Sequence, residues 1–83
     1  MSLPKILMYV RPDCEDTDLA RTVLQQHGLT WDEIDIEQDP DAMVRVKEWN
    51  QGRALTPTLW IGETMLVEPS AREIEDILSQ EIK

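Results

Sequence analysis

The feature that most constrains the fold is a short, unbroken apolar run near the beginning of the chain, Ile6–Val10. It is closed by Arg11-Pro12-Asp13, so it is short for a helix and far too short to cross a membrane. A strand that is apolar at every position is buried on both faces, which is typical of a sheet covered by helices on each side. The run therefore predicts a central strand, over residues 5–10, in an α/β domain.

A helix is predicted directly after this strand, over residues 14–27. Its apolar positions fall on one stripe, made of Leu19, Ala20, Val23 and Leu24. Acidic residues gather in its first turn, where the helix dipole favours them, and Gly28 follows as a C-terminal cap. A second strand is then predicted over residues 30–36, because Trp31, Ile34 and Ile36 stand among acids there.

Two further helices and a hairpin complete the predicted fold. Asp39 as cap and Pro40 as first helical residue open a helix that runs to Gly52, with a buried stripe of Ala42, Met43, Val46 and Trp49. Residues 58–61 and 64–67 flank Gly62-Glu63, the pattern of a two-residue hairpin turn. Ser70 and Glu73 form a capping box for a last helix, whose apolar face consists of Ile74, Ile77, Leu78 and Ile82.

The resulting order is βαβαββα, a four-stranded mixed sheet flanked by three helices. At 83 residues, the chain is expected to form a single domain over residues 1–83. The three tryptophans, Trp31, Trp49 and Trp60, are expected to fill the core of a chain that has no Phe.

Charge and cysteine content exclude several classes of function. The net charge of −9 disfavours nucleic acids and anionic membranes, and leaves neutral or cationic partners. With one cysteine, Cys14, and one histidine, the chain forms no internal disulfide and no ordinary zinc site. Since the N-terminus has no apolar signal stretch, we expect a cytoplasmic, reducing environment.

Cys14 is the candidate for chemistry. A lone cysteine is commonly a small buried hydrophobe, but this one follows an apolar strand and begins a helix. Unpaired backbone N–H groups at a helix N-terminus stabilise a thiolate, and the carboxyl ends of strands are where reactive sites of open α/β sheets lie. Both readings, buried filler and nucleophile, stay open on this evidence alone.

Three segments resemble the glutaredoxin family. Residues 9–17 read Tyr-Val-Arg-Pro-Asp-Cys-Glu-Asp-Thr, which is similar to the active-site segment, where a Tyr ends the first strand and Cys-x-x-Cys opens the helix. Residues 56–62 read Thr-Pro-Thr-Leu-Trp-Ile-Gly and resemble the cis-proline segment; residues 68–71, Glu-Pro-Ser-Ala, resemble the opening of the last helix in the mycoredoxin-like and NrdH-like branches. The resemblance implies a thioredoxin-like fold in which Thr56-Pro57 is cis and faces Cys14.

The chain departs from the family at the second cysteine, which is Thr17 here. An intramolecular dithiol cycle is therefore impossible, and a monothiol route through glutathione or another external thiol remains. Thr17 either donates a hydrogen bond to the Cys14 thiolate or is an ordinary residue of the first helical turn. The Gly-Phe-Ser form associated with iron–sulfur clusters is absent, so no bound metal or cofactor is expected.

The resemblance implies a set of glutathione-binding residues, each with a simpler alternative. Arg11 takes the position of the Lys that favours the thiolate and a glutathione carboxylate; it is otherwise an exposed loop cation. Thr56, before Pro57, offers backbone N–H and C=O to an extended substrate or is part of a turn. Arg53 reaches a glycyl carboxylate or is solvated, and Ser70 with the Ala71 amide binds an anion or only caps the helix.

We therefore expect an enzyme, a monomeric glutaredoxin-like thiol–disulfide oxidoreductase that uses glutathione as co-substrate and acts on protein mixed disulfides. The alternative is a redox-silent thioredoxin-fold module that binds a protein partner. The acids around Cys14 favour this alternative, since they oppose a second negative charge; these acids are Asp13, Glu15, Asp16 and Asp18. The helix dipole and Arg11 act in the opposite direction and lower the thiol pKa.

Overall fold

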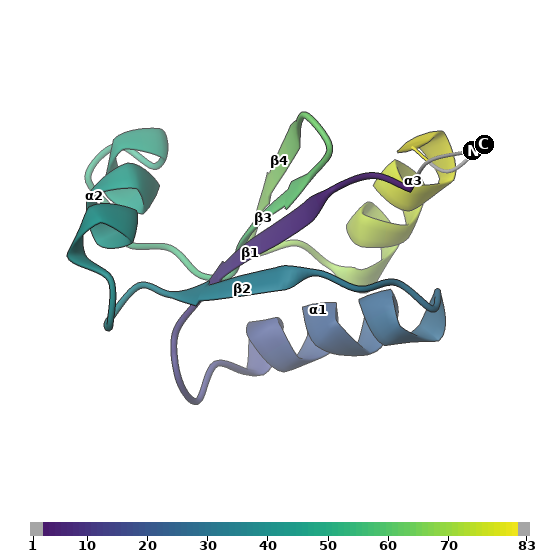
Figure 1. Cartoon of the computed structure of the whole chain (residues 1–83), viewed down its shortest axis with the longest axis horizontal. Coiled ribbons are helices and arrows are strands. Elements are labelled where there is room, and N and C mark those ends of the chain that lie inside the picture. The colour runs from purple at the N-terminus through teal and green to yellow at the C-terminus, as the bar shows by residue number, and fades with distance from the viewer. Residues whose placement is uncertain (1–2, 82–83) are drawn as a thin grey trace.

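A computed structural model describes residues 3–81, and at its centre is a four-stranded mixed sheet (Figure 1). The strands are β1 (Ile6–Val10), β2 (Asp32–Asp35), β3 (Thr58–Ile61) and β4 (Thr64–Val67), in the order β2-β1-β3-β4. β1 pairs parallel with β2 and antiparallel with β3, and β3 pairs antiparallel with β4. The apolar run at residues 6–10 is thus an inner strand, as the sequence predicts.

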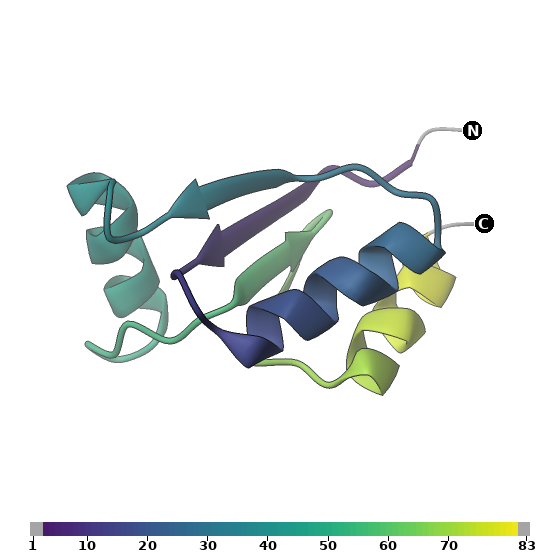
Figure 2. The ribbon, with the colours of Figure 1, turned by 90° about the horizontal axis from the view of Figure 1, so that it is seen from below.

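The three helices lie on both sides of this sheet. α1 (Glu15–Gln26) and α3 (Ala71–Glu81) pack side by side on one face, and α2 (Pro40–Trp49) lies toward one end of the other (Figure 2). The predicted order βαβαββα is confirmed. Within residues 3–81, no helix combines the length and apolar character needed to span a membrane.

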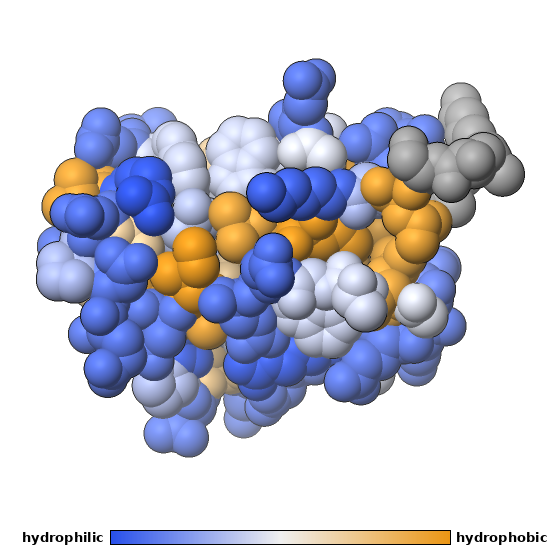
Figure 3. Space-filling model, viewed as in Figure 1, coloured by the Kyte–Doolittle hydropathy of each residue, from blue (hydrophilic) through white to orange (hydrophobic). Residues whose placement is uncertain are grey.

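Alternate residues of β1 serve two separate cores. Met8 points toward α1 and α3 and packs with Leu24, Leu59 and Ile74, all of them fully buried. Tyr9 points the other way and packs with Ile36, Ala42 and Val46 beneath α2. Because α2 covers only part of that face, apolar side chains remain visible over the sheet, surrounded by hydrophilic surface (Figure 3). Burial on both faces explains why β1 has no polar position.

The predicted stripe of the first helix is wrong at one position. Leu19 is 40% exposed, whereas Thr17 is 1% exposed and lies in the buried side of α1 with Ala20, Val23 and Leu24. Thr17 precedes Ala20 by three residues and Leu24 by seven, so it shares their face of the helix, while Leu19 lies at the margin. Helical position outweighs side-chain hydrophobicity here.

Two predicted elements are shorter than expected, and one predicted helical residue lies outside the described ones. β2 is an edge strand of Asp32–Asp35 instead of 30–36, with Ile36 buried just beyond it. α2 ends at Trp49 rather than at Gly52, because the Asn50 side-chain amide donates to the Val46 carbonyl and the chain turns. Ile82, predicted on the face of the last helix, lies outside the described residues.

The predicted caps and turn are confirmed. The Asp39 carboxylate accepts a hydrogen bond from the Ala42 N–H at 3.1 Å. Ser70 and Glu73 cap each other's backbone N–H groups at 3.0 and 3.1 Å. Gly62 has φ +59° in the β3–β4 turn, a conformation that glycine adopts without a steric penalty. These local signals fix where the elements begin and how β3 returns as β4.

Candidate active site

Cys14 is the N-cap residue of α1, at the point where the chain leaves the carboxyl end of β1. Its backbone is extended (φ −105°, ψ 115°), and its side chain makes no capping hydrogen bond. The residue is neither buried nor fully exposed. The thiol is thus free of a structural task at the helix terminus and is accessible from solvent.

The Thr56-Pro57 peptide is cis and lies against Cys14, as expected. The Cys14 thiol donates to the Thr56 carbonyl oxygen at 3.7 Å, and the Thr56 hydroxyl lies 3.9 Å from Sγ as a donor to it. Pro57 itself is fully buried. The loop before β3 therefore presents backbone and hydroxyl groups directly beside the sulfur.

Thr17 supplies a second hydroxyl to the same sulfur. The residue is 1% exposed, and no group in residues 3–81 makes a geometrically acceptable hydrogen bond to its Oγ1 atom. Oγ1 nevertheless lies close enough to Cys14 to favour the ionised sulfur. A neutral thiol is a weak acceptor, whereas a thiolate is a strong one, so ionisation of Cys14 provides the partner that this buried hydroxyl lacks.

These contacts shift the acidity of Cys14. Partial burial raises the pKa of the thiol, but the Thr17 hydroxyl and backbone, the Thr56 hydroxyl and the Asp16 backbone favour the thiolate and outweigh the burial, so the pKa lies below its ordinary value. The causes of this lowering are backbone and hydroxyl donors of neighbouring residues, and neither the charge of Arg11 nor the carboxylates of the flanking acids are among them.

Arg11 points toward another partner. Its Nε lies 3.6 Å from a carboxylate oxygen of Glu37, which follows β2, and both side chains are partly exposed. The predicted role of Arg11 at the thiolate therefore competes with this ion pair.

The other predicted glutathione residues lie in the segment before Thr56 and at the start of α3. Arg53 is exposed in the segment before Thr56. The Ser70 hydroxyl accepts a hydrogen bond from the Glu73 N–H, so its capping alternative is confirmed, and Ala71 begins α3. Thr56 and Thr17 are the predicted residues that the structure brings into contact with Cys14.

Glu68 is a residue near the site that the sequence reasoning missed. Its backbone N–H donates to the Pro57 carbonyl at 2.9 Å, its φ is +47°, and its side chain is exposed. Glu68 thus lies beside the cis-proline, one residue away from the carbonyl that contacts Cys14. Its position just before the Pro-Ser-Ala motif was visible in the sequence, but its proximity to Cys14 depends on the pairing of β3 with β4.

With this geometry in view, the comparison with protein families is decisive. The glutaredoxin family model matches residues 6–66, which include β1, Cys14, the cis-proline and most of the hairpin. The chain belongs to the glutaredoxin family. Family and fold together support thiol–disulfide oxidoreductase chemistry at the general level.

Solved structures agree on the thioredoxin-like fold of this glutaredoxin-family chain. A mutant of the thioredoxin-like protein BC3987 matches with a TM-score of 0.78 and 23% identity, over 90% of this chain and 95% of that one. Glutaredoxin from Brucella melitensis matches with a TM-score of 0.72 and 23% identity, over 93% and 84%. The holo form of glutaredoxin C1 from Populus tremula x tremuloides gives a TM-score of 0.65 and 14% identity, over 90% and 74%. No curated protein sequence matches significantly.

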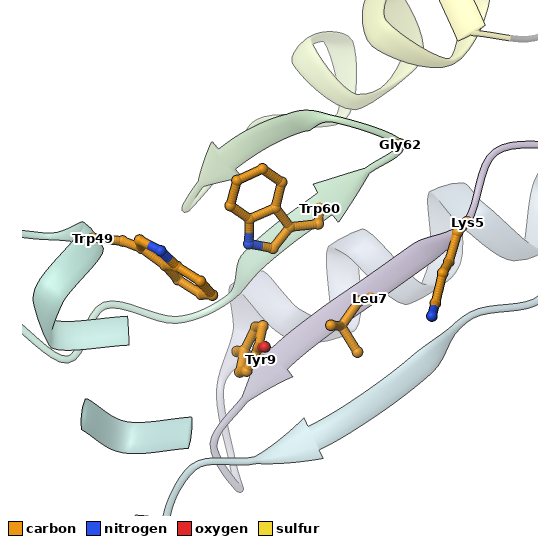
Figure 4. Close-up of a pocket in the computed structure, with 6 residues that line it drawn as sticks. All are labelled: Lys5, Leu7, Tyr9, Trp49, Trp60 and Gly62. Carbon is orange, nitrogen blue, oxygen red and sulfur yellow. The ribbon is translucent and has the colours of Figure 1, made fainter. Parts of the chain in front are cut away.

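A separate recess lies on the sheet face that α2 covers in part. It measures about 300 Å³ and is lined by Lys5, Leu7, Tyr9, Trp49, Trp60 and Gly62 (Figure 4). Trp49 makes edge-to-face contacts with Tyr9 and Trp60, with ring centroids 5.3 and 5.4 Å apart. Cys14 does not line this recess. The prediction that the tryptophans fill the core is corrected, because all three are partly buried and pack against the core from its edge.

Metal ligation has no evident location in the described part of the chain. Among residues 3–81, no three His, Cys, Asp or Glu side chains are grouped to hold an ion.

Proposed function

We propose that this protein is a monothiol, glutathione-dependent thiol–disulfide oxidoreductase, acting as a monomer in a reducing, cytoplasmic compartment without a bound cofactor. The observation that carries the proposal is the environment of Cys14: a partly exposed thiol of lowered pKa, placed between the Thr17 and Thr56 hydroxyls at the start of a helix. A thiolate is the nucleophilic form of cysteine, so these donors increase the reactive fraction near neutral pH.

The proposed reaction has two exchange steps. The Cys14 thiolate attacks the glutathione sulfur of a protein–glutathione mixed disulfide; the new bond joins Cys14 to glutathione, and the protein sulfur leaves as a thiolate that takes a proton from water. A second glutathione thiolate then attacks the glutathione sulfur of this adduct and releases oxidised glutathione and the Cys14 thiolate. The net exchange converts the mixed disulfide and one reduced glutathione into the protein thiol and oxidised glutathione, so the protein sulfur is reduced and the sulfur of the entering glutathione is oxidised.

The thiol that attacks in the second step belongs to another molecule, because the chain contains no other cysteine. Thr17 stands where a resolving cysteine would be, and its hydroxyl stabilises the thiolate both before the first step and as the leaving group of the second. The site is thus suited to the monothiol route.

Binding of glutathione is proposed along the loop before β3. The Thr56 backbone would pair with the extended tripeptide in the manner of a strand edge, beside cis Pro57. Arg53, Arg11, Ser70 and the Ala71 amide are available for the carboxylates, although Arg11 would have to leave Glu37.

A redox-silent protein-binding module is the second candidate function. Exposed carboxylates around Cys14 favour it, because they repel anionic glutathione. Under this alternative Cys14 is a slow thiol and the surface around Thr56 is a docking edge.

One rate measurement separates the two functions. We expect the protein to catalyse glutathione-dependent reduction of a small mixed disulfide between glutathione and a neutral thiol, and Cys14→Ser to abolish the catalysis. A rate equal to the uncatalysed one for both proteins overturns the enzyme proposal and leaves the binding module.

A further inference from the structure

We infer that the recess on the α2 side of the sheet is a binding site for a small planar aromatic molecule that carries a carboxylate. The recess is separate from Cys14, which does not line it, so the inference is independent of the proposed function. It rests on the aromatic side chains that form one end of the recess and on a lysine at the other (Figure 4).

The recess exists because α2 covers only part of its face of the sheet. α2 is 10 residues long and packs over the carboxyl end of β1, where Tyr9 is buried. Farther back along β1, Leu7 and its partner on β3, Trp60, are only partly buried. Concave, mostly apolar hollows are the usual form of small-molecule sites, and about 300 Å³ is at the lower end of their volumes.

Three aromatic side chains come together in the recess from three elements, Tyr9 from β1, Trp49 from α2 and Trp60 from β3. Trp49 contacts the other two rings edge to face, with interplanar angles of 75° and 71°. Because these contacts fix the rings, the walls are formed before a ligand arrives. The rings touch one another and leave no open cage for a cation, whereas the partly exposed indoles of Trp49 and Trp60 offer surface to a flat ring.

Lys5 supplies positive charge at the other end of the recess. It lies two residues before Leu7, roughly 7 Å along the strand, so its ammonium can reach the edge of a ring placed over Leu7. The Lys5 side chain is exposed, and the ion pairs found within residues 3–81 do not include it. The described residues that line the recess include neither Asp nor Glu. A carboxylate on the bound ring would therefore meet an unpaired ammonium.

Charge also argues against two other occupants of the recess. A cationic ligand would lie beside the Lys5 ammonium, which repels it. A second copy of the chain would bring together two molecules that each carry a net charge of −9. The same net charge acts weakly on a small anion already in the recess, because exposed charges are screened beyond about 8 Å at physiological ionic strength. The local lysine thus sets the preference.

The test follows the indole N–H signals of the 15N-labelled protein by NMR during titration with 2-naphthoate. We expect saturable shifts of the Trp49 and Trp60 signals, each assigned by its Trp→Phe variant. Trp31 is the internal reference, because it packs against the other core and its Nε1–H donates to Glu33. Absence of shifts at millimolar naphthoate overturns the inference. Larger shifts of Trp31 place the ligand in a neighbouring hollow that Trp31 and Lys5 both line, and also overturn it.

A neutral analogue and a matched pair of variants test the role of the charge. 2-Naphthalenemethanol has the same rings and should bind about threefold to fivefold more weakly, the usual effect of an exposed ion pair. Lys5→Gln should weaken naphthoate by the same factor and leave the alcohol unchanged. Lys47→Gln removes the same charge from the last turn of α2, outside the recess, and should change neither.

Two results of this comparison contradict the inference. Equal weakening of naphthoate by Lys5→Gln and Lys47→Gln attributes the preference to overall charge. Equal affinity of the native protein for the acid and the alcohol shows that the recess recognises only the rings, as a surface for an aromatic side chain of a protein partner would.

Discussion

The Cys14 sulfur lies 3.7 Å from the Thr56 carbonyl oxygen, across 42 residues of sequence. The contact joins the start of α1 to the loop before β3, and it exists because β1 and β3 are adjacent strands. A substrate disulfide that reaches the sulfur therefore comes close to the Thr56 backbone. The pairing of β1 with β3 determines this geometry, and the start of α1 and the loop before β3 supply the reactive groups.

Thr17→Val should raise the pKa of Cys14, because it removes a hydroxyl that favours the thiolate. Thr17→Ser, which keeps the hydroxyl, is the matched control and should stay near the native value. The pH dependence of iodoacetamide alkylation measures both. An unchanged pKa in Thr17→Val would show that the hydroxyl does not serve the sulfur.

The same substitution should not destabilise the fold at low pH. When Cys14 is a neutral thiol, Thr17 Oγ1 is buried without a partner, and replacing an unsatisfied hydroxyl by a methyl group of similar shape is neutral or stabilising. Urea denaturation at a pH well below the thiol pKa should give a free energy of unfolding equal to or above that of the native protein. A clear loss of stability there would reveal a hydrogen bond that this account omits.

Ionisation of Cys14 should make stability depend on pH. Its pKa is lowered in the folded protein, so the unfolded chain binds more protons between the folded and unfolded pKa values, and the free energy of unfolding rises with pH across that interval. The contribution is complete above the unfolded value and is lost as pH falls through the folded one. Denaturation at several pH values should show this rise in the native protein relative to Cys14→Ser; parallel curves would contradict it.

Leu24→Ala and Leu19→Ala compare two leucines of one helix. Leu24 is fully buried between α1 and the sheet, so its truncation should cost about 2–5 kcal/mol. Leu19 is 40% exposed, and its truncation should cost about 1 kcal/mol or less. Equal losses of unfolding free energy in chemical denaturation would show that Leu19 belongs to the buried face of the helix, as the sequence predicts.

The sequence was sufficient for the fold because its signals are local. An apolar run, two caps and a Gly turn define where the elements begin, and their order leaves few sheet topologies. Thr17 and Leu19 show the limit of this prediction. Hydrophobicity alone predicts that Leu19 is buried and Thr17 exposed, whereas the packing of α1 on the sheet buries Thr17 and leaves Leu19 40% exposed.

The site was predictable where it coincides with motifs and not where it depends on tertiary contacts. Cys14 and Thr56-Pro57 follow from the family resemblance, and the structure brings them together. The pairing of Arg11 with Glu37 and the position of Glu68 beside Pro57 could not be predicted, because each joins segments that only the folded sheet places side by side.

The central claim is that Cys14 is a nucleophile that exchanges with glutathione, and mass spectrometry after incubation with oxidised glutathione tests it most directly. The folded protein should gain one glutathione on Cys14, with no intramolecular disulfide, and excess reduced glutathione should remove it. Cys14→Ser should gain none. If the folded protein forms no adduct while the chain unfolded in denaturant forms it readily, Cys14 is a shielded cysteine and the account is wrong.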